Sequence, residues 1–207
     1  MNWLAHTFLS APHVQFQLGN LLADVVRGDD RAAMNREFLR GVECHKAIDT
    51  FTDSHPLVMR SRARLSAGYR RFSGVIMDVF YDHLLAMHWE HYSDEPLATF
   101  VSRFYAQAAA APPMLPPAAQ ATLDRIIRHD SLGSYREIDG VHRALRRIST
   151  YLRERWRRPI ALEDCIAELV ADQDAYAADF LEFFPQLRGH VLPWIADVST
   201  DRTVHQH

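Results

Sequence analysis

Residues 74–92 read G-V-I-M-D-V-F-Y-D-H-L-L-A-M-H-W-E-H-Y, and apolar side chains occur on almost every face of the helix that this stretch predicts. Such a helix belongs in the middle of a fold. Asp78 and Asp82 are one turn apart within it, so we expect both carboxylates to point into or beside the core. Because a buried carboxylate without a partner is costly or becomes neutral, we expect an arginine or a metal cation to compensate them. His83 directly follows, which favours the metal.

Helical periodicity continues on both sides of this stretch. Glycines number only 8, and alternating apolar and polar runs are scarce. Eight helices are predicted, over residues 14–27, 35–51, 57–69, 74–92, 96–110, 117–129, 139–155 and 162–184. The sequence therefore predicts an all-α fold with a single domain, residues 1–198, and a frayed polar tail, residues 199–207.

The step Asp53-Ser54-His55-Pro56 is expected to break the helix that begins near residue 35, because the residue before a proline is disfavoured in helical conformation. We expect Ser54 to cap the next helix. Asp53 is either a turn residue or part of a site, and the spacing does not decide between them.

Composition describes an ordinary globular protein. The chain has 207 residues, 48% of them hydrophobic, and a formal net charge of −3, which gives no general argument for binding nucleic acid. No apolar run approaches the roughly 20 residues of a membrane span, and the first residues do not resemble a signal peptide. The two cysteines, Cys44 and Cys165, are far apart and are expected to be free thiols. A cytoplasmic location is predicted.

A second pair of candidate ligands is His45 and Asp49, four residues apart on one helix. An exposed helix face explains this pair equally well. Asp24 taken alone fits a solvated helix face, and His6 fits a hydrogen-bonded core residue. Histidine and aspartate ligands without cysteine favour Mn²⁺, Fe²⁺ or Mg²⁺ over structural zinc. Such a cation polarises phosphoryl oxygens, which makes phosphoester hydrolysis one candidate activity.

Arginines supply 22 of the 23 basic residues and gather in two strips. The first comprises Arg60, Arg62, Arg64, Arg70 and Arg71, and no acidic residue occurs between Ser54 and Met77. The second extends from Arg143 to Arg158. Acidic residues after Leu162 offer partners within the fold, whereas an acidic protein offers partners outside it. Aromatic residues are not interleaved as a single-strand nucleic-acid groove requires, so nucleic acid is not expected.

Several motifs resemble the acyl carrier protein phosphodiesterases. They are M-N-W-L-A-H at residue 1, L-G-N-L-L-A-D-V-V-R-G at residue 18, H-K-A-I-D-T-F-T-D-S-H-P at residue 45, Y-R-R-F-S-G-V-I-M-D-V-F-Y-D-H-L-L-A-M-H-W at residue 69 and F-F-P-Q-L at residue 183. The resemblance extends to about Leu192. It implies a helical, HD-type metal-dependent phosphohydrolase that removes 4′-phosphopantetheine from holo-acyl carrier protein, with Mn²⁺ as the expected metal.

The resemblance also implies roles for single residues. It implies that Asp24 and His6 belong to the site. The implied metal group is Asp24, His45, Asp49, Asp78, Asp82 and His6. Proton transfer is assigned to His83, Asp53 or His55. From charge and position alone, Lys46 or Arg60 is expected to hold the phosphodiester oxygens, and Arg62, Arg64, Arg70 and Arg71 are expected to contact the acidic carrier protein.

Two other functions remain open from the sequence. One is hydrolysis of a small nucleotide or another phosphoester, in which case the arginines serve only the fold. The other is a non-catalytic helical protein that binds acidic partners.

Overall fold

The computed structural model describes residues 1–111 and 115–196, and the elements in this part of the chain are helices, which confirms the all-α prediction. The α-helices are α1 Trp3–Phe8, α2 Val14–Leu22, α3 Gly28–Ala32, α4 Arg36–Ser54, α5 Pro56–Arg64, α6 Ser73–Met87, α7 Leu97–Ala110, α8 Pro117–Arg128, α9 Ile138–Trp156, α10 Ile166–Ala171 and α11 Gln173–Ala196. Short 3₁₀ helices are η1 Arg70–Phe72, η2 Trp89–His91, η3 Gly133–Arg136 and η4 Leu162–Cys165. The number of α-helices in the described residues exceeds the predicted eight because the helix predicted over 162–184 is divided into α10 and α11, and because α1 and α3 were not predicted.

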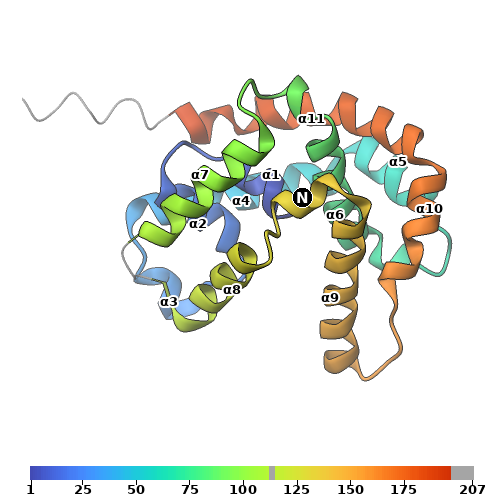
Figure 1. Ribbon diagram of the computed structural model, residues 1–207, viewed down its shortest axis with the longest axis horizontal. Helices are drawn as coiled ribbons and strands as arrows, with labels where there is room; N and C mark the ends of the chain where they lie inside the picture. The colour runs from blue at the N-terminus through green and yellow to red at the C-terminus, as the bar shows by residue number, and fades with distance from the viewer. Residues whose placement is uncertain (112–114, 197–207) are drawn as a thin grey trace, which may run out of the picture.

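Helix α6 lies in the middle of the fold, as the sequence predicted (Figure 1). Ile76, Phe80 and Leu84 are completely buried, and the helix packs against α1, α5, α9 and α11. Because apolar side chains cover nearly all of its faces, several helices can bury their apolar faces on it at once. Both cysteines are buried and free, as expected.

Helices α2 and α4 cross very closely, and two glycines make this possible. A Cβ at Gly19 would lie 2.0 Å from the carbonyl oxygen of Phe38, and a Cβ at Gly41 would lie 2.1 Å from that of Phe16. Any larger residue at either position would force the two helices apart. This close crossing brings Asn20 of α2 beside His45 of α4.

The predicted helix break is confirmed, although its capping residue differs from the prediction. Helix α4 ends at Ser54 and α5 begins at Pro56. The Ser54 hydroxyl donates back to the Thr50 carbonyl, while the His55 side chain accepts from the Leu57 amide and so caps α5. Ser54 was the wrong choice because it still belongs to the last turn of α4, where its hydroxyl reaches a carbonyl of the preceding turn.

Several predicted helices were wrong at their ends. The helix expected over 57–69 ends at Arg64, and the helix expected over 74–92 ends at Met87 and is followed by η2. The helix expected over 14–27 ends at Leu22, because the amides of Val25 and Val26 both turn back to the Leu22 carbonyl. The segment 162–184 forms η4, α10 and α11, and α11 continues through Pro185 as far as Ala196. Leu187 and Val191 beyond that proline are fully buried, so packing compensates for the lost backbone hydrogen bond.

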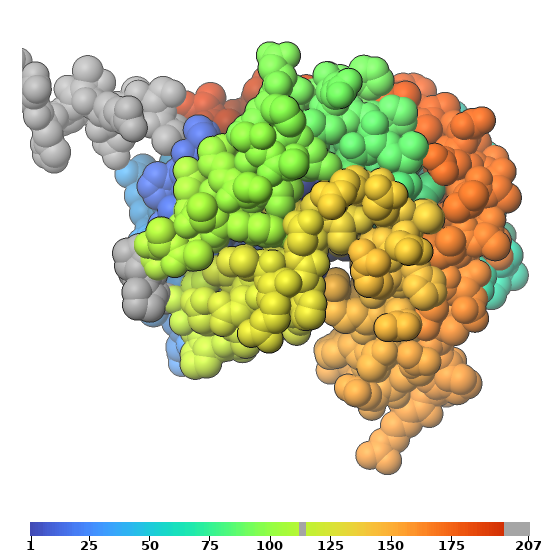
Figure 2. All heavy atoms as spheres, viewed as in Figure 1, coloured from blue at the N-terminus to red at the C-terminus, as the bar shows by residue number. Residues whose placement is uncertain are grey.

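The outer helices leave a hollow on one face. Helix α9 projects from the body of the molecule, and α8 lies beside it across the lower part of the view (Figure 1). The space-filling view shows the surface hollowed between α8 and α9 (Figure 2). None of the helices in the described ranges combines the length and apolar character needed to cross a membrane. The predicted boundary at residue 198 and the tail 199–207 lie outside the described residues.

Candidate metal centre

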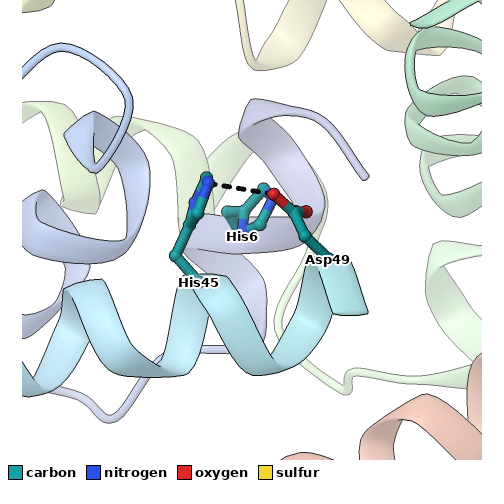
Figure 3. Close-up of side chains that lie close together, drawn as sticks. All are labelled: His6, His45 and Asp49. Carbon is teal, nitrogen blue, oxygen red and sulfur yellow. Dashed lines mark ion pairs between the residues drawn. The ribbon is translucent and has the colours of Figure 1, made fainter. Parts of the chain in front are cut away.

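Three predicted ligands converge where α1 meets α4. His45 and Asp49 rise from one face of α4, and His6 reaches the same point from α1 (Figure 3). The Nε2 atom of His45 lies 3.1 Å from Asp49 Oδ2, and the Nε2 atom of His6 lies 3.2 Å from Asp49 Oδ1. The two imidazole rings stack with centroids 4.1 Å apart. These are the residues of the described chain whose ligand atoms lie close enough together to hold one metal ion.

Asn20 orients both imidazoles from the opposite side. Its Nδ2 donates to the His6 carbonyl at 2.9 Å and to Ser10 Oγ, so its Oδ1 faces His6 Nδ1 at 2.8 Å. Its backbone carbonyl lies 2.8 Å from His45 Nδ1. Both oxygens can only accept, so the Nδ1 atom of each histidine carries the hydrogen. A hydrogen-bonded Nδ1 is the usual support of a metal-binding histidine, because it leaves the other nitrogen free to bind.

Both Nε2 atoms are buried and make no hydrogen bond, although a carboxylate lies beside them. In the neutral tautomer each presents a lone pair to Asp49, which is unfavourable unless a positive charge lies between them. A proton on Nε2 or a bound cation supplies that charge. Two imidazole nitrogens and one carboxylate form a donor set that suits a divalent transition metal, so the residues fit the metal that the sequence predicted.

The ionisation of this group follows from its neighbours. Burial favours neutral Asp49, but the two imidazoles outweigh burial and hold the pKa of Asp49 well below its usual range. Burial also opposes protonation of His45, yet the adjacent Asp49 raises the pKa of His45. At His6, burial and the charge of His45 together lower the pKa. A carboxylate with a lowered pKa therefore faces two imidazoles, one with a raised pKa and one with a lowered pKa.

Asp24 and Asp78 lie at the margin of the group. Asp24 Oδ2 is 3.7 Å from His45 Nε2, and its side chain is 81% exposed. Asp78 Oδ1 accepts from the backbone nitrogen of Met1 at 2.9 Å, and that nitrogen is 3.7 Å from Asp49 Oδ1. Asp24 is thus free to move toward His45, whereas Asp78 is held by the first residue.

Asp82 lies apart from the cluster. It is fully buried and accepts hydrogen bonds from the amides of Leu4 at 2.7 Å and Ala5 at 3.1 Å. Burial raises its pKa to about 7, although these amides and a nearby positive charge oppose the shift. The compensation expected for this carboxylate comes from the open N–H groups of α1 instead of an arginine or a metal. Asp82 therefore anchors the helix that carries His6.

The three residues predicted for proton transfer lie elsewhere. His83 is buried, its Nδ1 is 2.6 Å from the carbonyl of Tyr135, and burial lowers its pKa. Asp53 pairs with Arg62 at 2.6 Å, and His55 caps α5. The structure does not bring any of them to the His6–His45–Asp49 cluster.

Most cations predicted to contact substrate are paired inside the protein. Lys46 lies 2.7 Å from Glu43. The Nε atom of Arg60 donates to Asp179 at 2.7 Å, and Arg64 contacts both Asp179 and Asp172. The sequence left open whether these arginines pair with acidic residues after Leu162, and the structure shows that Arg60 and Arg64 do. Of the rest of the strip, Arg71 lies over the ring of Trp156, and Arg70 is exposed on η1.

Comparisons with known proteins show the family of the chain. A family model described as acyl carrier protein phosphodiesterase matches residues 1–187. The chain belongs to this family. Two curated members, from Salmonella agona and from Enterobacter sp., are 34% and 33% identical over 190 residues, which cover 90% of this chain and 95% of each relative. No solved structure shows a significant match.

Within this acyl carrier protein phosphodiesterase family member, sequence reasoning missed one supporting residue, Asn20. In the sequence it lies on the same face of the helix predicted over 14–27 as Asp24, and that face was expected to be solvated. The structure shows it completely buried, with both its amide and its carbonyl engaged at the two histidines. An amide flanked by Leu18, Leu21 and Leu22 in the sequence was the available signal, since a buried amide needs hydrogen-bond partners.

Proposed function

We propose that the protein hydrolyses the phosphodiester between 4′-phosphopantetheine and a serine of holo-acyl carrier protein, and that it needs a divalent metal held by His6, His45 and Asp49. The observation that carries the proposal is the pair of buried Nε2 atoms aimed at one ionised carboxylate, within a chain of the acyl carrier protein phosphodiesterase family. The products would be apo-carrier protein and 4′-phosphopantetheine.

The donor set narrows the choice of metal. Two imidazole nitrogens with a single carboxylate favour Mn²⁺ or Fe²⁺ over Mg²⁺, which prefers oxygen ligands. When bound, the metal would stabilise negative charge on the phosphoryl group and make water more acidic. We assign Asp24 as a further ligand, because its exposed side chain can close the 3.7 Å separation from His45 Nε2.

The chain's own residues supply the preorganisation. Asn20 holds both rings in the tautomer that frees Nε2. Asp49 stays ionised over the physiological pH range because both imidazoles favour its charged form. Asp82 fixes the first turn of α1, so His6 meets α4 in one orientation. Rigid ligands of this kind keep the cost of reorganisation low during the reaction.

The experiment has two readouts. Mass spectrometry of holo-carrier protein after incubation with enzyme and Mn²⁺ should show loss of the prosthetic group, and a chelator should abolish it. Equilibrium dialysis should show Mn²⁺ binding that is lost in His45→Ala and Asp49→Asn. Asp53→Asn is the matched control, because its carboxylate pairs with Arg62 away from the cluster and its loss should leave both readouts unchanged.

The outcomes separate the alternatives. Cleavage of small phosphodiesters with an intact holo-carrier protein would favour the small-molecule phosphohydrolase. Carrier-protein binding that survives in His45→Ala and Asp49→Asn, with no metal uptake and no cleavage, would leave a non-catalytic binder.

A further inference from the structure

A cavity of about 580 Å³ lies between α8, η3 and α9, where Figure 2 shows the surface hollowed. Its wall includes Arg125 from α8 and three arginines from α9, Arg143, Arg146 and Arg147. We call this the arginine cleft. Glu154 is the only acidic residue among those that line it. In a chain with net charge −3, this is a local concentration of positive charge.

The cleft arginines are not neutralised by the fold. Within the described ranges, no carboxylate forms an ion pair with Arg125, Arg143 or Arg146, and all three are exposed. Arg147 is half-buried, and both burial and the charge of Arg125 lower its pKa. Like charges held together without a counter-charge are unfavourable. An anion that enters the cleft supplies the negative charge that the fold does not provide, and is therefore attracted to it.

The arginine cleft adjoins the metal cluster through the first three residues. Tyr135 in the cleft wall accepts a hydrogen bond from Asn2 Nδ2 at 3.0 Å, and Arg147 lies 4.4 Å over the Trp3 ring. Met1, one residue earlier, places its nitrogen 3.7 Å from Asp49 Oδ1. A partner seated in the cleft is therefore separated from the cluster only by this short segment.

We infer that the arginine cleft docks an acidic protein surface, so that a phosphoester carried by that protein reaches the His6–His45–Asp49 cluster. The inference rests on the proposed function, in which the acidic protein is the carrier protein. It assigns the docking role to α8 and α9 and removes it from Arg60, Arg62 and Arg64 of α5.

The shape of the surface favours a protein over a small anion. Helix α9 has 19 residues and is therefore about 28 Å long, and exposed arginines occur along it beyond the cleft. Exposed aromatic rings accompany them, since Tyr151 is 59% and Trp156 is 40% exposed. Arginine, tyrosine and tryptophan are the residues enriched at protein interfaces and their hot spots. A single phosphate would occupy only a small part of this surface.

The test uses the double variant Arg143→Glu, Arg146→Glu. Both side chains are exposed and unpaired, so the variant should fold, which thermal unfolding checks. Affinity for apo-carrier protein, measured by calorimetry, should fall about ten- to hundredfold, because attraction becomes repulsion. The rate at which a small phosphodiester without protein is cleaved should stay unchanged. The control is Arg103→Glu, which reverses an arginine of α7 that pairs with Glu95 and does not line the cleft.

Three results would overturn the inference. The first is unchanged carrier-protein affinity in the double variant. The second is an equal loss for the small phosphodiester, which would make the cleft a site for the reacting group. The third is displacement of the carrier protein by a short RNA at equal charge concentration, which would indicate a general polyanion surface. Because the affinity measurement needs no turnover, it remains valid even if the proposed hydrolysis fails.

Discussion

On α5, Arg60 and Arg64 lie against Asp179 and Asp172, whereas Arg143 and Arg146 on α9 contact no carboxylate in the part of the chain that the structure describes. Both regions appear in the sequence as arginine-rich segments. The first has its counter-charges within the chain, so its arginines join α5 to the C-terminal helices. In the second, Arg143 and Arg146 have none within the described residues, and their charge remains available to a partner. Arginine density therefore does not identify a binding surface until its pairing is known.

The strongest test of this comparison is Asp179→Ala. Asp179 is buried and accepts from Arg60, Arg64 and Ser61, so its removal leaves these donors without their acceptor. We expect the free energy of unfolding in urea to fall by about 3 kcal/mol. Asp53→Ala, which removes an exposed pair, should cost less than about 1 kcal/mol. Equal losses of unfolding free energy in the two variants would mean that the α5 arginines do not join α5 to the C-terminal helices.

The affinity of this protein for the carrier protein should depend on salt only through the arginine cleft. Raising the ionic strength from about 0.05 to 0.3 M should raise the apparent KM several-fold, since the Debye length falls below about 10 Å in this range. Arg143→Gln with Arg146→Gln should flatten the dependence, and Arg60→Gln should leave it intact. A salt profile that flattens only in Arg60→Gln would return the docking role to α5.

The dependence of stability on acid pH should also differ between the paired arginines of α5 and the unpaired arginines of α9. Although burial opposes it, the arginine neighbours hold the pKa of Asp179 below its ordinary value of 3.8. A depressed pKa contributes stability that is present above the unfolded-state pKa and is lost as pH falls through the folded-state pKa. The difference in unfolding free energy between wild type and Asp179→Asn should therefore shrink below about pH 4. The double variant Arg143→Gln, Arg146→Gln should show no such change, and a constant difference for Asp179→Asn would contradict the pairing.

The smallest effect should come from Glu154→Gln. Removing the one acid that lines the arginine cleft should strengthen carrier-protein binding by about twofold, the size typical of an exposed charge. Glu90→Gln makes the same change at an exposed position on η2 and should leave affinity unaltered. Calorimetry with both variants checks the comparison, and weaker binding by Glu154→Gln would show that this acid itself contacts the partner.

The sequence predicted much of this molecule where the signal was local. The buried character of α6, the break before Pro56 and the shared helix face of His45 and Asp49 all depend on residues within a few turns of one another. The helix ends were less predictable. Leu22 ends α2 through a turn, and α11 continues through Pro185 because apolar residues beyond it are buried. Family resemblance, rather than spacing, indicated His6 and Asp24.

What the sequence determined by itself is the helical class, the family and a set of residues capable of binding a metal. Only the tertiary structure decided which of them meet. Asp82 has the sequence spacing of a metal ligand, yet its carboxylate accepts hydrogen bonds from the open amides of Leu4 and Ala5 and lies apart from the His6–His45–Asp49 cluster. His6 looked like a core residue, yet the close crossing of α2 and α4 lets Asn20 turn it toward Asp49. Helical periodicity sets neighbours one turn apart, whereas these contacts join residues 14 to 78 positions apart and are set by packing.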